Sequence, residues 1–375
     1  MTATVRGGEY TTEDPALEAQ QNPGDERALQ QLYTDFARHG MMPLWTQRDD
    51  LMTTRPQPGA RPARWRWADL YPLAERSGEL VPVGRGGERR AIGLGNPGIP
   101  GQPYATPTLW CAIQYLGPRE TAPAHRHTQT AFRFVVEGEG VWTNVEGDPV
   151  TMRRGDLLLT PSMHFHEHHN TTDAAMAWID GLDIPLVSSL DAGFFEFGPD
   201  VLGTTATPAR SRNERLWGHP GLRPVSAADD APSSPLMAYR WEHTDAALAA
   251  QLELEDEGSP GVLQPGHAAV RFTNPTTGRD ALRTMRTEMH RFRAGTTTAP
   301  ERVVGSAVWQ VFDGTGTVSI GDERYDVARG DIVAVPSWAP VSVTAHGTLN
   351  AFRFGDDPVY EALGLARRER DGAAR

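Results

Sequence analysis

The stretch that decides the fold begins Pro123-Ala124-His125-Arg126-His127 and ends Pro161-Ser162-Met163-His164-Phe165-His166-Glu167-His168-His169-Asn170. Side chains two residues apart on a β-strand point to the same face, so His125 and His127 could hold one ion from one strand. Glycine-rich turns lie between the two clusters and are typical of hairpins. A closed antiparallel barrel would bring the second cluster opposite the first. The stretch therefore predicts a metal site inside a β-barrel.

The third ligand has to come from the second cluster, which offers His164, His166, His168 and His169. The first three share one face of an extended segment, and the fourth faces the other way. The two clusters resemble the metal-binding motifs of the cupin superfamily, in which a glycine, a proline, a ligand histidine and an asparagine follow at fixed spacings. Placed on Gly155, Pro161 and Asn170, that spacing selects His166. We take His125, His127 and His166 as the predicted metal triad.

Composition excludes several classes of protein. The chain has 375 residues, of which 39% are hydrophobic and 22% charged, and these values suit a water-soluble globular protein of two domains. Its formal net charge of -12 argues against a nucleic-acid partner, because phosphate binding needs a basic face. The single cysteine, Cys111, allows no intrachain disulfide and no cysteine-based zinc site. Neither a signal peptide nor an apolar run of about 20 residues is apparent, so we expect a cytoplasmic protein without a membrane partner.

An internal repeat shows that the barrel occurs twice. Arg154-Gly155-Asp156-Leu157 through Ser162 recurs as Arg329-Gly330-Asp331-Ile332 through Ser337, and Arg133 to Gly140 recurs as Trp309 to Gly316. The metal ligands do not recur. Around Glu301 the second copy has no histidine, and Val341 stands where the first copy has His166. The sequence predicts one metal ion per chain, in the first barrel.

These patterns predict an all-β-dominated fold with a helical N-terminal arm. Two double-stranded β-helix barrels would form a bicupin. The expected parts are an arm with a helix and a Trp/Arg-rich extension, a metal-binding catalytic cupin, a linker with a short helix, a degenerate cupin and a tail: residues 1–100, 101–190, 191–265, 266–365 and 366–375. The short helix of the linker is expected over residues 246–254. Dense tryptophan in the arm is typical of a packed interface, so we expect a homo-oligomer.

A metal held by three neutral imidazoles would keep its positive charge and several open positions. Histidine ligands suit iron, zinc, copper or nickel, so the ligands alone do not select the metal. Adjacent open positions would let a substrate with two neighbouring oxygen donors and dioxygen bind side by side. This is the arrangement that a ring-cleaving dioxygenase needs.

A more specific resemblance covers most of the chain. Pro123 to Gln129, Asn96-Pro97-Gly98, the Trp/Arg-rich arm and Glu361-Ala362-Leu363-Gly364-Leu365 together resemble the gentisate 1,2-dioxygenase family, which includes salicylate and 1-hydroxy-2-naphthoate 1,2-dioxygenases. The resemblance implies one Fe(II) ion per chain, O2 as co-substrate and a small aromatic carboxylate as substrate. It also implies that both atoms of O2 enter the acid, that the ring is cleaved between the carboxyl-bearing and hydroxyl-bearing carbons, and that the protein is a homotetramer.

The resemblance also implies roles for further residues. Carboxylate binding falls on Arg89 and Arg133, the pocket wall on Trp110 and Gln114, and catalytic support on His168 and Asp180. Arginine offers a bidentate fork to a carboxylate, and histidine can move a proton near neutral pH. Alternatives stay open at several of these positions. Arg90 adjoins Arg89, so only one of the two can face inward; Trp110 and Gln114 could be barrel filling, His168 could be a competing ligand, and Asp180 could orient a neighbour.

Met163-His164-Phe165 departs from the tryptophan-rich trio usual in the family, which favours a substituted salicylate over gentisate. Two other functions compete. A non-oxygenase cupin metalloenzyme commonly adds a carboxylate ligand just after the histidine pair, and residues 128–134 supply none. A ligand-binding bicupin of the storage or sensor type would lack the triad or add a basic DNA-binding domain. The sequence therefore favours the dioxygenase.

Overall fold

The computed structural model describes residues 23–46, 51–81, 90–199, 202–203, 208–227 and 230–370. The chain forms two compact units, Met1–Gln57 and Pro58–Arg375. In the first unit, helix α2 (Pro23–Arg38) precedes the short 3-10 helix η1 (Leu44–Thr46). Trp45 packs edge-on against Phe36, with ring centroids 6.2 Å apart, and its indole N–H donates to the Tyr33 hydroxyl over 3.2 Å. No helix among the described residues is long and apolar enough to cross a membrane.

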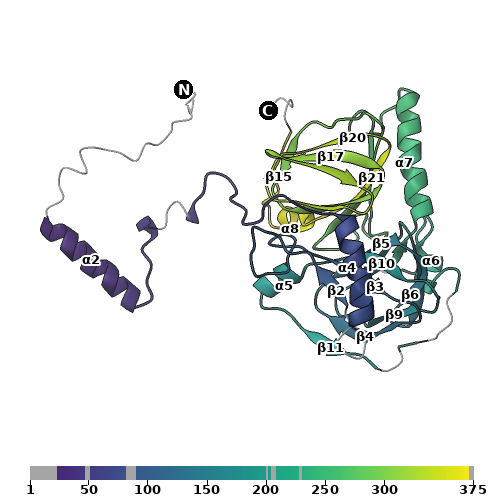
Figure 1. Cartoon of the computed structure of the whole chain (residues 1–375), viewed down its shortest axis with the longest axis horizontal. Helices are drawn as coiled ribbons and strands as arrows, with labels where there is room; N and C mark the ends of the chain where they lie inside the picture. Colours follow the sequence, from purple (N-terminus) through teal and green to yellow (C-terminus); the bar gives the residue numbers. More distant parts are fainter. Residues whose placement is uncertain are drawn as a thin grey trace. The chain divides into compact units, whose positions relative to one another are not determined.

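Two barrels of antiparallel strands make up the second unit (Figure 1). The sheets of the first barrel have the orders β12-β8-β5-β10-β3-β2 and β11-β4-β9-β6-β7. Its strands are β2 (Ala91–Gly93), β3 (Trp110–Leu116), β4 (Thr121–His127), β5 (Ala131–Glu137), β6 (Glu139–Val145), β7 (Asp148–Arg153), β8 (Leu157–Thr160), β9 (His166–Asn170), β10 (Met176–Leu182), β11 (Phe195–Phe197) and β12 (Ala238–Tyr239).

The second barrel repeats this layout with sheets ordered β1-β19-β16-β21-β14-β13 and β18-β17-β20-β15-β22. Its strands are β1 (Ala63–Trp65), β13 (His267–Arg271), β14 (Arg286–Phe292), β15 (Glu301–Val303), β16 (Ala307–Asp313), β17 (Thr315–Ile320), β18 (Glu323–Ala328), β19 (Ile332–Val335), β20 (Val341–Ala345), β21 (Leu349–Gly355) and β22 (Arg368–Arg370). The helices of this unit are α4 (Trp67–Leu80), α5 (Ile184–Ser189), α6 (Arg212–Trp217), α7 (Trp241–Asp256) and α8 (Asp357–Ala362).

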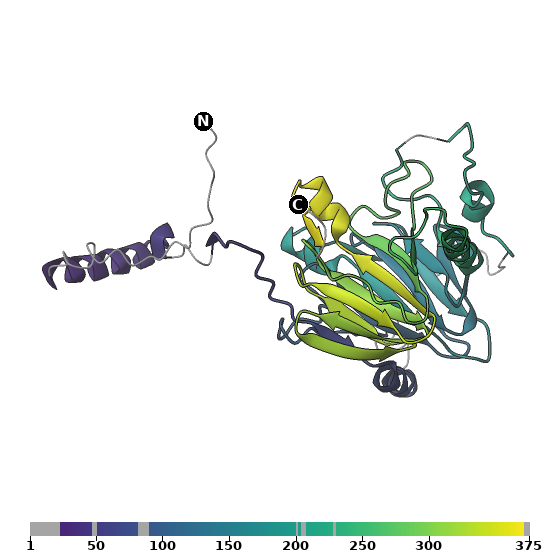
Figure 2. The same cartoon turned by 90° about the horizontal axis from the view of Figure 1, so that it is seen from above.

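An aromatic layer joins the two barrels, whose strands lie in successive layers in Figure 2. Phe132 and Phe134 of β5 point out of the first barrel toward Phe352 and Phe354 of β21. Phe134 and Phe352 stack with their centroids 4.1 Å apart and an angle of 5° between planes. Because side chains alternate along a strand, the residue between the two phenylalanines of β5, Arg133, faces the interior of the first barrel. The aromatic layer thus fixes the direction of a site residue.

One sheet of each barrel ends in a strand that is distant from that sheet's other strands in sequence. β1 precedes the first barrel in sequence but pairs with β19 of the second, and β12 lies between the two barrels in sequence and pairs with β8 of the first. Each of these two edge strands continues into a helix that begins with a tryptophan, α4 at Trp67 and α7 at Trp241. Part of the Trp/Arg-rich extension is therefore an element of the second barrel. The domain boundaries expected from the sequence stay predictions.

The glycine-aspartate turns of the repeat hold these two helices. Asp156 accepts the Trp241 backbone N–H over 3.0 Å, and Asp331 accepts that of Trp67 over 2.8 Å. Gly155 has a φ of 87°, and a Cβ there would lie 2.8 Å from the Trp241 ring. The turn therefore needs glycine both for its backbone angle and for the contact. The helix expected over residues 246–254 begins five residues earlier because a carboxylate from the barrel caps it.

Candidate active site

Two neighbouring strands of the first barrel bring three histidines together. β4 carries His125 and His127, and its partner β9 places His166 directly opposite His125. One ring nitrogen from each of the three histidines lies within 4.8 Å of the others, and among the described residues this is the one group of three such side chains with metal-ligand spacing. Strand alternation and strand pairing, both local consequences of the sequence, create this convergence.

The second ring nitrogen of each histidine is held by the backbone. The Nδ1 atoms of His125, His127 and His166 lie 3.0, 2.8 and 3.0 Å from the carbonyl oxygens of Pro123, Gln129 and His164. A carbonyl only accepts, so each Nδ1 carries the proton and each Nε2 keeps its lone pair. The Nε2 atom of His166 is buried and has no hydrogen-bond partner among the described residues. A metal ion bound by three Nε2 atoms would satisfy this acceptor, so the donor set fits a metal.

His168 lies two residues further along β9 and is also buried, but it stands outside the group of three. Its ring centroid is 5.9 Å from that of His166 and 5.4 Å from that of Trp178. Its Nδ1 lies 2.8 Å from the hydroxyl of Thr143 on β6. Burial, followed by the positive charge of Arg133, lowers the pKa of both His166 and His168 well below the usual value, so both rings are neutral.

The other two histidines of the cluster play no part in the group. His169 faces the opposite side of β9 and stacks on Trp142, with ring centroids 4.1 Å apart. His164 precedes β9, and its Nδ1 bonds the carbonyl of Ser162 over 3.0 Å.

A buried guanidinium lies in the same barrel interior. Arg133 of β5 stands opposite Asp180 of β10, and both are only 4% exposed. The Arg133 Nε is 3.5 Å from an Asp180 oxygen, while its Nη1 donates to the Thr160 hydroxyl over 2.6 Å. Asp180 also accepts the indole N–H of Trp178 over 3.0 Å. This network fixes the fork of Arg133 in one orientation.

The Arg133–Asp180 pair is incompletely satisfied. The Nε of Arg133 is buried without a hydrogen-bond partner among the described residues. Burial lowers the pKa of Arg133 and raises the pKa of Asp180 to about 6, and the attraction between the two groups opposes both shifts. A buried cation with one distant carboxylate gains from an anionic ligand. The interior of this barrel therefore favours a small carboxylate beside the histidine group.

Known proteins resemble this chain in both sequence and fold. The cupin domain family matches residues 112–184. A gentisate 1,2-dioxygenase from Streptomyces sp is 70% identical over 346 residues, covering 92% of this chain and 96% of the relative. A 5-aminosalicylate 1,2-dioxygenase from Comamonas sp is 36% identical over 91% of this chain and 90% of its own length. The chain belongs to the gentisate 1,2-dioxygenase family.

Solved structures agree with this membership. A salicylate 1,2-dioxygenase from Pseudaminobacter salicylatoxidans superposes with a TM-score of 0.90 at 56% identity, covering 94% of this chain and all of that one. A variant of that enzyme in complex with gentisate gives a TM-score of 0.93 at 55% identity, over 98% of this chain and all of that one. The bicupin fold and the family expected from the sequence are confirmed. This member of the gentisate 1,2-dioxygenase family is a ring-cleaving dioxygenase.

The strand ladder places the expected pocket residues of this dioxygenase on the inner face of β3. Gln114 stands opposite Trp178, and Ala112 stands opposite Asp180. Trp110, opposite Leu182, continues the same face, and Gln114 is buried while Trp110 is half-buried. Gln114 and Trp110 therefore share the interior with Asp180.

Of the two adjacent arginines, Arg89 lies outside the described residues. Arg90 is buried and forms a close ion pair with Glu120. Its Nη1 also donates to the carbonyl of Val81 over 2.9 Å. Arg90 is therefore occupied by a structural network with Glu120 and the Val81 carbonyl.

Three site features were missed from the sequence. Thr160 orients Arg133, and Thr143 orients His168, although both threonines are distant from their partners along the chain. β11, within the segment expected to be a linker, pairs with β4 and lays Phe195 on His125 with ring centroids 5.6 Å apart. The alternating Phe195-Glu196-Phe197 is a weak strand signal that could have indicated this strand. The threonines carry no local signal, because their partners come from other strands.

Proposed function

We propose that the chain is an Fe(II)-dependent gentisate 1,2-dioxygenase. It would add both atoms of O2 to gentisate and open the ring between the carboxyl-bearing and hydroxyl-bearing carbons. The observation that carries the proposal is the incompletely paired, buried Arg133 in the interior that also holds three convergent imidazoles. A metal group alone would serve many reactions. A metal group beside an anion-seeking guanidinium suits an aromatic acid that chelates through adjacent oxygens.

The relatives support gentisate as the first substrate to test. The Streptomyces enzyme at 70% identity is a gentisate 1,2-dioxygenase. Salicylate is the second candidate, because the structure at 56% identity is a salicylate 1,2-dioxygenase. The sequence around Met163 favoured a substituted salicylate as substrate. A relative at 36% identity is a 5-aminosalicylate 1,2-dioxygenase, so substituted salicylates are the third class of substrate to test.

His125, His127 and His166 would hold the metal through their Nε2 atoms. When bound, Fe(II) supplies positive charge and open positions at which the two oxygens of the substrate and dioxygen can meet. Iron is chosen from the family, since imidazole ligands also suit zinc, copper and nickel.

The protein groups around the metal would bind and orient the acid. Arg133 would bind the substrate carboxylate through its planar fork. Asp180, anchored by the Trp178 indole, and Thr160 would act as positioning residues that hold this fork. Trp110 and Gln114 would form the wall beside the ring, and Arg89 would add a second cation to the carboxylate.

His168 would receive the proton of the ring hydroxyl. The Thr143 hydroxyl donates to the sulfur of Met152 over 3.1 Å, so its oxygen accepts from the His168 Nδ1–H. The Nε2 of His168 is then left as a lone pair. Because burial keeps the pKa of this imidazole low, it is neutral before the substrate binds, and its Nε2 can accept a hydrogen bond from the ring hydroxyl.

The decisive experiment is anaerobic loading with Fe(II), followed by oxygen uptake with gentisate, salicylate, 5-aminosalicylate and 1-hydroxy-2-naphthoate. We expect the highest kcat/KM with gentisate and a ring-opened keto acid as product. A preference for salicylate would support the second candidate. No oxygen uptake with any of the four acids by chains that retain iron would contradict the proposal.

The oligomeric state and location stay predictions. The described part of the N-terminal unit exposes large apolar side chains, including those of Met42, Trp45 and Met52. Such side chains favour association with another copy of the chain. Light scattering should show a homotetramer, and a monomer would contradict this expectation.

A further inference from the structure

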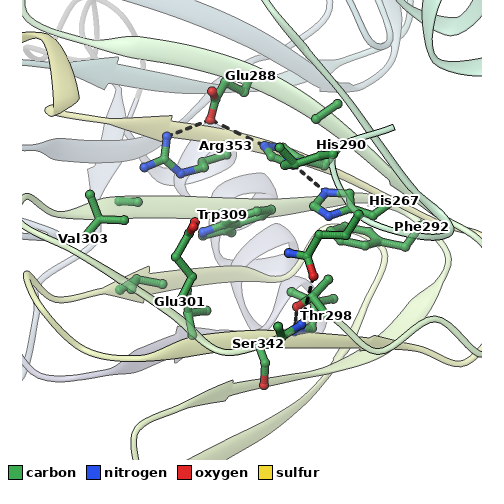
Figure 3. A pocket seen from close by; sticks show the side chains of 18 of the residues that line it. His267, Glu288, His290, Phe292, Thr298, Glu301, Val303, Trp309, Ser342 and Arg353 are labelled. Atoms are coloured by element: carbon green, nitrogen blue, oxygen red, sulfur yellow. Dashed lines mark hydrogen bonds and ion pairs between the residues drawn. The ribbon is translucent and has the colours of Figure 1, made fainter. Parts of the chain in front are cut away.

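The second barrel contains a partly open cavity of about 430 Å³ that the proposed reaction does not use. This volume lies in the range of sites for small organic ligands. Its walls come from strands β13 to β16 and β19 to β22. Six polar or aromatic side chains line it (Figure 3): His267, Glu288, His290, Glu301, Trp309 and Arg353.

Strand registers show that this cavity corresponds to the active site of the first barrel. Trp309 of β16 stands opposite Arg353 of β21, as Arg133 of β5 stands opposite Asp180 of β10. Arg353 in turn faces Glu288 of β14. The guanidinium has thus moved to the neighbouring strand, and a tryptophan takes its former position.

The positions equivalent to the three histidines also carry different residues in the second barrel. Glu301 of β15 stands opposite Val341 of β20, as His125 stands opposite His166 in the first barrel. The oxygen Oε1 of Glu301 accepts from Arg370 over 3.0 Å. An ion pair between protein groups therefore lies where the first barrel gathers its imidazoles.

The cation of this cavity is already satisfied. Arg353 donates through Nη1 to Glu288 over 2.8 Å and through Nη2 to Asp357 over 3.0 Å. Arg133 in the first barrel has one carboxylate at 3.5 Å. A second anion would therefore gain little from Arg353 and would meet the charges of Glu288 and Glu301. The cavity does not suit a carboxylate ligand.

A ligand cation is disfavoured as well. Arg271, Arg353 and Arg368 contribute to the walls, and a positive ligand would meet all three. The polar groups of the cavity that still lack a partner need hydrogen bonds and not an opposite charge. Neither the remaining oxygen of Glu288, Oε1, nor the indole N–H of Trp309 forms a hydrogen bond within the described part of the chain. One is an acceptor and the other a donor, and a neutral hydroxyl can serve both.

Glu288 is well prepared to accept a hydrogen bond. Burial alone would raise the pKa of Glu288, but the ion pair with Arg353 outweighs it and holds the pKa below the usual value. His290 lies 3.5 Å from Glu288 and bonds His267 over 2.9 Å, which fixes the back of the cavity. A hydrogen bond to an ionised carboxylate is stronger than one between neutral groups.

The remaining walls suit a flat apolar ring. Trp309 packs against the His290 ring with centroids 4.6 Å apart. Val303, Val335 and Val343 line the cavity from three different strands. Aromatic and branched apolar side chains bind a ring by burying its surface.

We propose that the second barrel binds a small uncharged phenol, with its ring among Trp309 and the valines and its hydroxyl on Glu288. The first barrel would then bind an aromatic acid and the second a phenol, and the charged side chains that line each barrel would determine this difference.

Phenol itself is the probe, titrated by calorimetry into the full-length, metal-free chain at pH 7. We expect one phenol per chain. The Val303→Phe substitution fills the cavity and should weaken binding more than tenfold. Glu288→Gln replaces the charged acceptor by a neutral one and should weaken binding about tenfold. The matched change in the first barrel, Arg133→Met, should leave the affinity for phenol unchanged.

Thermal unfolding of each variant verifies that the chain is folded. Unchanged affinity in both second-barrel variants, or loss of binding in Arg133→Met, would place phenol elsewhere and overturn the proposal. Benzoate or benzylamine binding that is sensitive to Val303→Phe and as tight as that of phenol would overturn its chemical basis. None of these outcomes depends on turnover, so the result is independent of the proposed reaction.

Discussion

The first barrel gathers three histidines where β4 meets β9, whereas the second has a glutamate and a valine on β15 and a valine on β20 at the equivalent positions. Both barrels keep the glycine-aspartate turn, the strand order and the helix capped by that turn. Strand hydrogen bonds, turns and the aromatic layer between the barrels stabilise both of them. The interior side chains can therefore differ without loss of the fold. Duplication therefore preserved a frame in which the interior chemistry can change independently.

The largest difference between the barrels should appear when the triad is removed. Replacing His125, His127 or His166 by alanine should remove the bound metal and lower turnover at least thousandfold, since two ligands hold a metal poorly. Metal content per chain and oxygen uptake measure both effects.

The matched control in the second barrel is Val303→Ala, at the position equivalent to His127. It should change neither the metal content nor the turnover. A His168→Ala variant should be slow and still retain its metal; an empty site in that variant would show that His168 is a ligand.

The next effect concerns the two guanidinium positions. Arg133→Met should raise KM for the aromatic acid about a hundredfold, because it removes a charge-assisted bidentate contact in a buried site. Trp309→Phe, at the equivalent position of the second barrel, should leave KM unchanged. Steady-state oxygen uptake compares the two, and equal KM values for wild type and Arg133→Met would remove this arginine from the substrate site.

A smaller contrast lies in the two capping aspartates. Asp156 caps α7 and also binds Arg240 over 2.6 Å, whereas Asp331 caps α4 without such an ion pair in the described chain. We expect Asp156→Ala to lower the free energy of unfolding by about 3 kcal/mol. Asp331→Ala should lower it by about 1 kcal/mol. Denaturant unfolding of both variants tests this order, and equal losses would mean that the ion pair adds no stability.

The last contrast should be a pH dependence of opposite sign in the two barrels. Burial raises the pKa of Asp180 to about 6, above the unfolded value of about 4. Between these pH values the native chain keeps a proton that the unfolded chain has lost, so this group's contribution to stability falls as pH rises. The pKa of Glu288 is lowered by its ion pair, so its contribution is present above about pH 4 and is lost on acidification.

Unfolding free energies of the metal-free chain from about pH 2 to pH 7 test these signs. The wild-type chain should lose some stability as the pH rises because of Asp180, and Asp180→Asn should abolish that loss. It should also lose some stability as the pH falls because of Glu288, and Glu288→Gln should abolish that second loss. Parallel pH profiles for the two variants would show that the barrels do not differ in this respect.

The convergence of the three histidines was predictable because its information is local. A pair two residues apart on one strand points to one face, and the glycine and proline before His166 fix the returning strand. The repeat at Gly330 was equally visible, since turn residues have to be kept wherever the backbone needs a positive φ. Even the loss of ligands in the second barrel could be read from aligned positions such as Val341.

The partners of the site residues could not be predicted in this way. Thr160 reaches Arg133 and Thr143 reaches His168 only through strand pairing, and nothing near either threonine indicates its partner. The start of α7 at Trp241 was missed because its cap, Asp156, lies far away in sequence. Such contacts depend on where the chain folds back, which local propensity does not encode.

The sequence by itself determined two repeated β-barrels, three imidazoles on one of them and the family to which the chain belongs, because alternation, turn chemistry and spacing act between near neighbours. Only the tertiary structure decided that β1 crosses over to the second barrel and that Arg133 lacks full compensation while Arg353 has it. The physical reason is that a buried charge takes its properties from whichever groups the fold brings against it, and those groups come from distant strands.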